Sequence, residues 1–269
     1  MPELPEVETT RRGIAPYLIG RRLLGAVIRN PRLRWPVAAN LNDLLRGQRP
    51  VAVDRRGKYL LLRLASGCLV IHLGMSGSLR IARAAEPPRA HDHLDLVIED
   101  GTCLRLHDPR RFGAVIWTTR PPEDHPLIRD LGPEPWSATA EYLWRRARGR
   151  RTPVKNYIMD GRTLVGVGNI YASEALFSAG IRPLRAAGRV TRAEYARLAA
   201  AIIRVIDRAI AAGGNTLRDF LGADGEPGYF RQRLRVYGRA GRPCRRCRVL
   251  VRRVVIAGRA TYYCPRCQR

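Results

Sequence analysis

Four cysteines near the C-terminus constrain the fold more than any other feature of this 269-residue sequence. Cys244-x-x-Cys247 is followed, after sixteen residues, by Cys264-x-x-Cys267. Two such pairs at this spacing are typical of a structural zinc site, in which four thiolates close the tetrahedral shell of the metal. Disulfides are the alternative for cysteine-rich chains, but no stretch resembles a secretory signal. We therefore expect one structural Zn²⁺ ion.

The segment between the two cysteine pairs has the pattern of a β-hairpin. We expect strands over 249–256 and 260–263, joined by a turn at 257–259 with Arg259 at its tip. Arg248 follows the second cysteine, where such knuckles normally carry glycine. A positive φ costs a residue with a side chain about 1 kcal/mol. The sequence therefore predicts a strained knuckle and an intact metal site.

The rest of the sequence divides into a β-rich half and a helical half. Apolar residues recur at helical spacing over residues 3–18, which predicts an N-terminal helix. Short apolar runs separated by Gly, Asp and Pro then predict an antiparallel β-sandwich or barrel. Its expected strands lie at 26–28, 59–64, 68–72, 94–98, 103–106 and 114–117.

Proline-rich residues 118–137 are typical of a linker, with a short helix expected at 125–131. Helical spacing predicts further helices at 141–148, 154–159, 170–179 and 192–212. We place domain boundaries at 1–120, 121–137, 138–221 and 222–269. The chain is thus predicted to be an α+β multidomain protein: an N-terminal helix with an antiparallel β-sandwich, a helical domain and a zinc-finger hairpin with four cysteine ligands. The glycine-rich segment 221–229 is either a mobile lid or a linker.

The charge of the chain points to a polyanionic partner. A net charge of +26 favours nucleic acid, although a ribosomal or chromatin-like protein, or an arginine-biased genome, would also account for it. Among the 49 lysines and arginines only Lys58 and Lys155 are lysines, and a lysine can release its proton where an arginine cannot. No apolar run reaches about 18 residues. We expect a cytoplasmic or nucleoid-associated protein without membrane association.

The N-terminus carries a candidate nucleophile. Methionine before proline is usually removed, which leaves Pro2 as a secondary amine beside Glu3. An α-amino group has a pKa of about 8, far below that of a lysine, so more of it is neutral at pH 7. A neutral amine next to a carboxylic acid can form an imine with an aldehyde-level carbon. Taken alone, these residues also fit an ordinary helix start.

Further motifs have the composition of DNA contacts. Met75 lies in His-Leu-Gly-Met-Ser-Gly, whose two glycines indicate a loop in which backbone approaches another group closely, with a core methionine as the alternative. Arg110 and Phe112 lie in Asp-Pro-Arg-Arg-Phe-Gly, a pattern that favours a wedge in the minor groove. Gly-Val-Gly before Asn169 favours a phosphate cradle at a helix N-terminus, with Asn169 as the cap. The basic run 145–151 and His91 are also candidates for phosphate contact.

Taken together, these motifs resemble the bacterial formamidopyrimidine-DNA glycosylases, from Pro-Glu-Leu-Pro-Glu at the start to Cys-x-x-Cys-Gln at the end. The resemblance implies an N-terminal β-sandwich, a helix–two-turn–helix domain and a zinc finger. It implies a base-excision-repair enzyme that removes 8-oxoguanine and ring-opened purines and then cleaves the strand. Its partner is double-stranded DNA with oxidised purines, opposite cytosine, and we expect a monomer. Segment 217–229 resembles the family's lesion-capping loop.

The resemblance also implies catalytic roles. Pro2 attacks C1′ and forms a Schiff base, and Glu3 donates a proton to the sugar ring. Lys58 assists β-elimination, while Arg259 assists δ-elimination and holds a phosphate. Glu6 orders the N-terminus.

Other motif positions are implied to contact DNA. Met75, Arg110 and Phe112 fill the gap that the flipped nucleotide leaves, with Arg110 facing the orphaned cytosine. A damaged base is cheaper to extrude than an intact one, and the emptied stack must be filled. The remaining implied contacts are His91, Arg151, Lys155 and Asn169.

Two other functions remain open from the sequence. The endonuclease VIII branch acts on oxidised pyrimidines and shares the Pro2-Glu3 start, but Leu4 and the Arg110–Phe112 motif favour the purine branch. A zinc-containing DNA-binding protein without catalysis would explain the charge and the cysteines, but not the N-terminal carboxylates.

Overall fold

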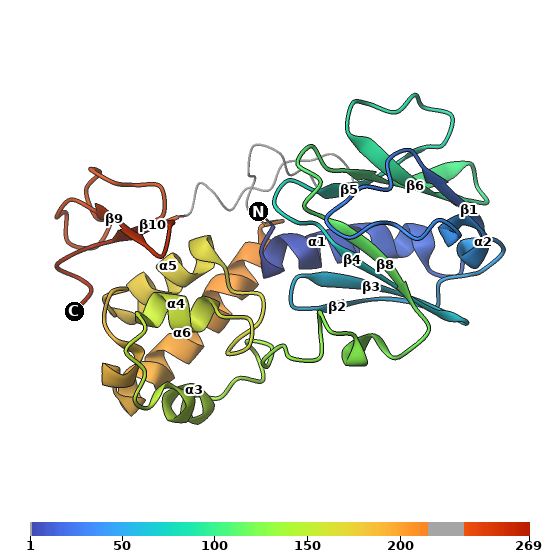
Figure 1. Cartoon of the computed structure of the whole chain (residues 1–269). Coiled ribbons are helices and arrows are strands. Elements are labelled where there is room, and N and C mark those ends of the chain that lie inside the picture. The colour runs from blue at the N-terminus through green and yellow to red at the C-terminus, as the bar shows by residue number, and fades with distance from the viewer. Residues whose placement is uncertain (1, 215–233) are drawn as a thin grey trace. The chain divides into compact units, whose positions relative to one another are not determined.

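The computed structural model describes residues 2–214 and 234–269, which form two compact units (Figure 1). The first unit contains residues 2–129 and 212–214, and the second contains 130–211 and 234–269. The segment 217–229, predicted to cap the lesion, lies outside the described residues. No helix in the described ranges is long and apolar enough to cross a membrane.

The first unit is an antiparallel β-sandwich with a long N-terminal helix, as the sequence predicts. Helix α1 spans Leu4–Leu18 and contacts β2, β3 and β5. One sheet has the strand order β1-β6-β7-β5 and the other β2-β3-β4-β8, and every pairing is antiparallel. The strands are β1 Leu23–Ile28, β2 Ala52–Arg56, β3 Tyr59–Leu64, β4 Gly67–His72, β5 Ser78–Arg83, β6 Asp92–Ile98, β7 Thr102–His107 and β8 Ala114–Thr118.

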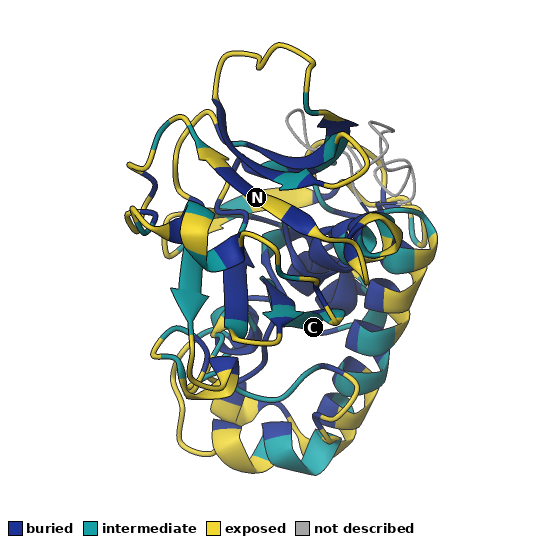
Figure 2. Ribbon diagram, turned by 90° about the vertical axis from the view of Figure 1, so that its right-hand side faces the viewer, coloured by how far each residue is buried: buried dark blue, intermediate teal, exposed yellow. Residues whose placement is uncertain are grey.

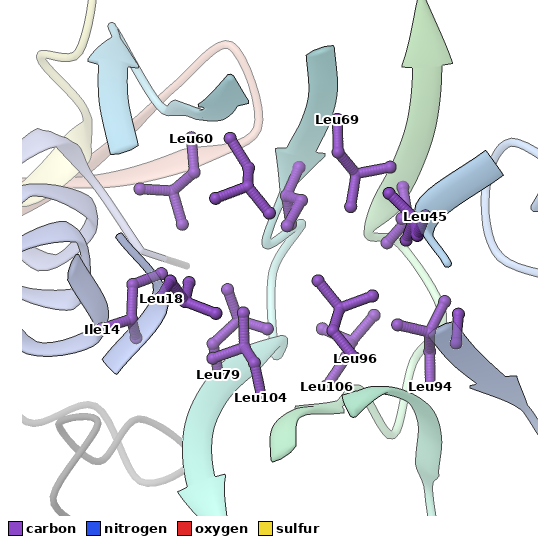
Figure 3. Close-up of a cluster of buried hydrophobic side chains, with 14 of the residues drawn as sticks. Ile14, Leu18, Leu45, Leu60, Leu69, Leu79, Leu94, Leu96, Leu104 and Leu106 are labelled. Atoms are coloured by element: carbon purple, nitrogen blue, oxygen red, sulfur yellow. The ribbon is translucent and has the colours of Figure 1, made fainter. Parts of the chain in front are cut away.

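The core of this unit lies between the two sheets. Leucines of β3 and β4 face leucines of β5, β6 and β7, and α1 adds Ile14 and Leu18 (Figure 3). All of these side chains are buried, so their removal from water is the main source of stability for the sandwich. The strands are largely buried, whereas most of the loops between them are exposed (Figure 2). Loops at the strand ends are therefore free to carry function.

Some elements differ from the sequence predictions. Strands β2 and β5 were missed because both lie at sheet edges, where fewer side chains are buried and the apolar run is short. A short helix, α2 (Leu41–Leu45), was also missed. The helix predicted at 125–131 is wrong, since only a 3-10 turn at Pro122–Asp124 forms before a series of turns. Closely spaced prolines there remove the backbone donors that a helix needs.

The second unit is built around a helix that is buried on nearly all sides. Helix α5 (Asn169–Ala179) contacts α4, α6 and the strand β10, and it ends at Gly180 in the left-handed conformation (φ 75°). The other helices are α3 (Ala140–Ala147), α4 (Val154–Met159) and α6 (Arg192–Ala211), with a 3-10 turn at Ala187–Arg189. Successive turns at 161–168 join α4 to α5, as in a helix–two-turn–helix arrangement.

The cysteine-rich tail forms the predicted hairpin with shifted ends. Strand β9 spans Arg252–Ile256 and pairs with β10, Arg259–Tyr263. The turn has Ala257 at φ 46° and Gly258 at φ 73°, the left-handed pair expected of a two-residue type I′ hairpin. Arg259 therefore begins β10 and pairs with Ile256, which corrects its predicted place at the tip.

Candidate functional site

The N-terminus is held by a reciprocal pair of glutamates. Pro2 is buried and Glu3 is the N-cap of α1. The Glu3 side chain accepts from the Glu6 backbone, while the Glu3 N–H donates to Glu6 Oε2 at 2.8 Å. This capping box fixes the chain that leads into the helix. Backbone at Gly214 passes so close that an added Cβ would lie 3.3 Å from Glu6 Oε1. Glu3, the residue next to Pro2, is thus held in place on both its side chain and its backbone.

Lys58 lies in the two-residue turn between β2 and β3, beside a histidine that sequence reasoning missed. Gly57 has φ 57° and allows this tight turn. Tyr59 pairs with His72 of β4, and their rings lie 4.8 Å apart. Burial, together with the charges of Lys58 and Arg34, lowers the pKa of His72 to about 4. The Gly74 N–H donates to His72 Nδ1 at 3.0 Å, which requires a neutral ring.

Two loops bring the three predicted wedge residues to one pocket. Met75 follows β4, and Arg110 and Phe112 lie between β7 and β8. Met75 and Phe112 are each 41% exposed, and the Arg110 guanidinium carbon lies 4.6 Å from the centre of the Phe112 ring. The pocket, of about 590 Å³, is lined by Arg32, Arg34, His72, Gly74, Met75, Arg110, Arg111 and Phe112. Cations surrounding exposed apolar side chains suit a surface that meets an unstacked base step and its phosphates.

His91, predicted to contact phosphate, lies just before β6. It is exposed at the start of β6 with φ 70°, a conformation uncommon for residues other than glycine. Its neighbour His93 is buried, and His93 Nε2 donates to the Asp108 carbonyl at 2.9 Å. Among the residues that the structure describes, metal-type ligands gather only at the four cysteines. His91 is therefore available to a phosphate, whereas His93 is part of the buried structure.

Lys155 and Asn169 lie together in the second unit, where the structure corrects the prediction that Asn169 is the helix cap. Lys155 is only 1% exposed; its Nζ donates to Asn169 Oδ1 and, at 2.6 Å, to Thr261 Oγ1. The cap of α5 is Gly168, so Asn169 is the first helical residue and its side chain is not the cap. Asn169 Nδ2 donates to the Ala260 carbonyl at 3.0 Å. A buried ammonium thus joins α4 and α5 to the strand that Arg259 begins, while Arg151 remains exposed.

A buried carboxylate on α5, which sequence reasoning missed, orders the chain before the zinc finger. Glu174 is 4% exposed and accepts from the backbone N–H groups of Arg235, Val236 and Tyr237, each at 2.9 Å. Burial raises the pKa of Glu174, against the opposing effect of those three hydrogen bonds. The available signal was a single carboxylate in a largely apolar helix, where a buried charged group needs hydrogen-bond partners.

The four cysteines have the geometry of a zinc site. Their sulfur atoms all lie within 4.8 Å of one another, with Cys244 and Cys267 4.0 Å apart and Cys247 and Cys264 3.4 Å apart. Zinc–sulfur bonds of about 2.3 Å in a tetrahedron place sulfurs about 3.8 Å apart, which these distances bracket. Arg248 has φ 68°, as its position in the knuckle predicts. One Zn²⁺ ion fits these ligands.

Comparison with known proteins gives independent evidence on the family of this chain. Residues 1–115 match the formamidopyrimidine-DNA glycosylase N-terminal domain, 131–221 its helix–two-turn–helix domain, and 241–269 the zinc finger found in this family and in isoleucyl-tRNA synthetase. The chain is 58% identical to the formamidopyrimidine-DNA glycosylase of Syntrophotalea carbinolica, with all of both chains covered. The chain belongs to the formamidopyrimidine-DNA glycosylase family. The enzyme of that name from Methylococcus capsulatus is also 58% identical, again with both chains fully covered.

Solved structures of family members agree with the fold. The crystal structure of the MutM (Fpg) protein of Thermus thermophilus is 43% identical and has a TM-score of 0.88, with 99% of this chain and 98% of that chain covered. A Lactococcus lactis Fpg variant bound to Fapy-dG-containing DNA is 31% identical, with a TM-score of 0.91 and both chains fully covered. The α+β architecture, the helix–two-turn–helix and the zinc finger predicted from the sequence are therefore confirmed.

Proposed function

We propose that this protein is a bifunctional DNA glycosylase and abasic-site lyase of base excision repair. It excises 8-oxoguanine and formamidopyrimidines through its N-terminal proline and then cleaves the strand by β- and δ-elimination. The observation that carries the proposal is the buried Pro2-Glu3 pair, fixed at the start of α1 by Glu6. A nucleophile must be held where its target arrives, and this arrangement does so.

The chemistry begins after Met1 has been removed. With Met1 attached, Pro2 nitrogen is an amide and cannot attack. The free secondary amine attacks C1′, the damaged base leaves, and Glu3 protonates the ring oxygen O4′ as the sugar opens. The product is an iminium between Pro2 and C1′, which makes the C2′ proton acidic. Lys58 assists β-elimination at that carbon, and Arg259 holds a phosphate and assists δ-elimination.

The proposed DNA contacts fall into two groups. Met75, Arg110 and Phe112 fill the stack after the nucleotide is flipped, with Arg110 facing cytosine on the other strand. The second group acts at the DNA backbone: His91, Arg151 and Asn169 contact it, and Lys155 supports them. For Lys155 the burial at 1% supports a contact made through Asn169 in place of a direct one. We infer a monomer that acts on double-stranded DNA.

The zinc ion would have a structural role in this function. Cys244, Cys247, Cys264 and Cys267 would hold it, and when bound it fixes the hairpin that carries Arg259. Gln268 adds to the brace, because its Oε1 accepts from Cys264 N at 2.8 Å and its Nε2 donates to the Ile181 carbonyl at 2.9 Å. The finger is thereby attached to the turn that follows α5.

Borohydride trapping on a duplex with 8-oxoguanine opposite cytosine tests the proposal. Protein starting at Pro2 should form a covalent adduct, and a matched protein with one extra N-terminal residue should form none. An adduct from the blocked protein, or no adduct from the free one, would refute the role of Pro2. A thymine-glycol duplex run in parallel tests the endonuclease VIII alternative. Faster cleavage of that duplex would place the substrate among oxidised pyrimidines.

A further inference from the structure

One buried carboxylate connects the loops that carry the exposed DNA-contact candidates of the first unit. Asp108 is completely buried. Its Oδ1 accepts from the Ser76 hydroxyl at 2.8 Å, in the Met75 loop, and its Oδ2 accepts from Gly113 N–H at 2.8 Å, just after Phe112. The Arg110 N–H in turn donates to Ser76 Oγ at 3.2 Å. Two side chains thus join both loops.

The backbone of Asp108 extends the connection to the third loop. Its N–H donates to the His91 carbonyl at 3.0 Å, and its carbonyl accepts from His93 Nε2 at 2.9 Å and from Arg111 N–H at 3.1 Å. Every polar group of this residue is therefore used. Since Asp108 is buried, each bond lost would leave a partner unsatisfied.

Close backbone packing makes the two wedge loops one body. Gly74 has φ 62°, and an added Cβ would lie 2.4 Å from the Phe112 carbonyl carbon. A Cβ on Gly113 would lie 3.0 Å from the His72 carbonyl oxygen. Only residues without side chains allow such contact. Packing brings the loops together, and the hydrogen bonds of Asp108 and Ser76 hold the backbone beside their exposed side chains.

We propose that Asp108, acting through Ser76, is a positioning residue that aligns Met75, Arg110 and Phe112 as a single plug. The inference rests on the proposed function, because a plug matters only if a nucleotide leaves the stack. Reading the orphaned base needs Arg110 at a fixed distance from the opposite strand. Loosening one loop relative to the other therefore degrades discrimination between opposite bases before it affects chemistry at C1′.

The two bridges, from the Asp108 side chain to Ser76 and to Gly113, depend more on hydrogen-bonding geometry than on the negative charge. In Asp108→Asn the remaining oxygen can accept from Gly113 N–H and the new amide can donate to Ser76 Oγ, so both bridges persist. The Ser76 hydroxyl hydrogen loses its acceptor, so Asn should keep the two loops aligned at some cost in the free energy of unfolding. Alanine at the same position removes both bridges at once.

The test compares Asp108→Ala, Asp108→Asn, Ser76→Ala and the double alanine variant with wild type. Single-turnover excision of 8-oxoguanine is measured opposite cytosine and opposite adenine. Cleavage of a single-stranded abasic oligonucleotide serves as the reference, since it has no stack to fill. Asp100→Ala is the matched control: Asp100 braces the β6–β7 turn by accepting from Thr102 N at 2.9 Å and Thr102 Oγ1 at 2.6 Å, at the far end of the same strands.

Asp108→Ala and Ser76→Ala should each lower the ratio of the excision rate opposite cytosine to the rate opposite adenine about tenfold. Single-strand cleavage, Asp108→Asn and Asp100→Ala should stay within about twofold of wild type, and the double variant should lose no more than Asp108→Ala. An unchanged ratio in both alanine variants, equal losses on all substrates, or a defective Asp108→Asn would overturn the inference. If Asp108→Ala does not fold, Ser76→Ala decides alone. Failure of wild type to excise 8-oxoguanine would refute the proposed function instead.

Discussion

Replacing Lys155 with methionine separates a buried brace from a direct DNA contact. Nζ of Lys155 donates to Asn169 Oδ1 and Thr261 Oγ1, and the Ala260 carbonyl lies 3.4 Å away. With 1% of the residue exposed, little of the ammonium can reach a phosphate. Methionine has a similar length and keeps the packing, so the variant removes the charge and the hydrogen bonds alone.

The expected change in stability is small because two large effects oppose each other. Two hydrogen bonds from a charged donor contribute about 1.5–3 kcal/mol each. Returning the ammonium to water on unfolding releases a desolvation penalty of several kcal/mol, which the folded wild type must overcome. We expect Lys155→Met to lower the free energy of unfolding by less than about 2 kcal/mol. The Asn169 side chain and the start of β10 lose their common partner, so DNA affinity should fall about tenfold.

The salt dependence of DNA affinity is the deciding assay. Fluorescence anisotropy with a non-cleavable abasic-analogue duplex gives the slope of log affinity against log salt between about 50 and 200 mM. Arg151→Met is the matched control, because Arg151 is exposed and proposed to contact phosphate; it should reduce the slope by about one. Lys155→Met should weaken binding at every salt concentration with the slope unchanged. A slope reduced as in Arg151→Met would refute the brace and identify Lys155 as a phosphate contact.

Two further perturbations have defined outcomes. Removal of zinc by a chelator should disorder the hairpin and abolish specific DNA binding, measured by circular dichroism and anisotropy; intact binding after verified zinc loss would contradict this. Below pH 6.5 the unfolded chain protonates a histidine that the fold keeps neutral, since burial, Lys58 and Arg34 lower the pKa of His72 to about 4. Its contribution to stability is therefore present above about pH 6.5 and is lost as the pH falls towards 4. Between pH 7 and 5, urea unfolding should show wild type losing up to about 2 kcal/mol more than His72→Gln, and equal losses would contradict the assignment.

The sequence predicted those parts of the molecule whose physical cause is local. The spacing of the cysteines is enough to predict a four-sulfur cluster, because all four ligands lie in the same short segment. The positive φ of Arg248 follows from the geometry of a knuckle, and φ is 68°. Helix α1 follows from apolar spacing, and the reciprocal bonds of Glu3 and Glu6 follow from residues three positions apart.

Long-range contacts were not predictable in this way. The partners of Lys155 lie on α5 and β10, and the partner on β10 is more than a hundred residues away in sequence. The residues next to Lys155 in the sequence therefore do not indicate that it is buried. Asn169 has the composition of a cap, but Gly168 takes that place and frees the amide for Lys155. Asp108 was visible within its motif only as a turn residue. Its role needs Ser76, which another hairpin brings beside it.

The two lysines of this arginine-rich chain are retained for different physical reasons. At position 155 the three hydrogens of an ammonium can point to oxygens on α5 and β10, around a point with almost no exposure. A guanidinium is planar and larger, so it would have to displace one of those partners. Lys58 lies partly exposed in the turn between β2 and β3. The proposed role of Lys58 in β-elimination would account for a lysine there, because an ammonium can release its proton and a guanidinium cannot.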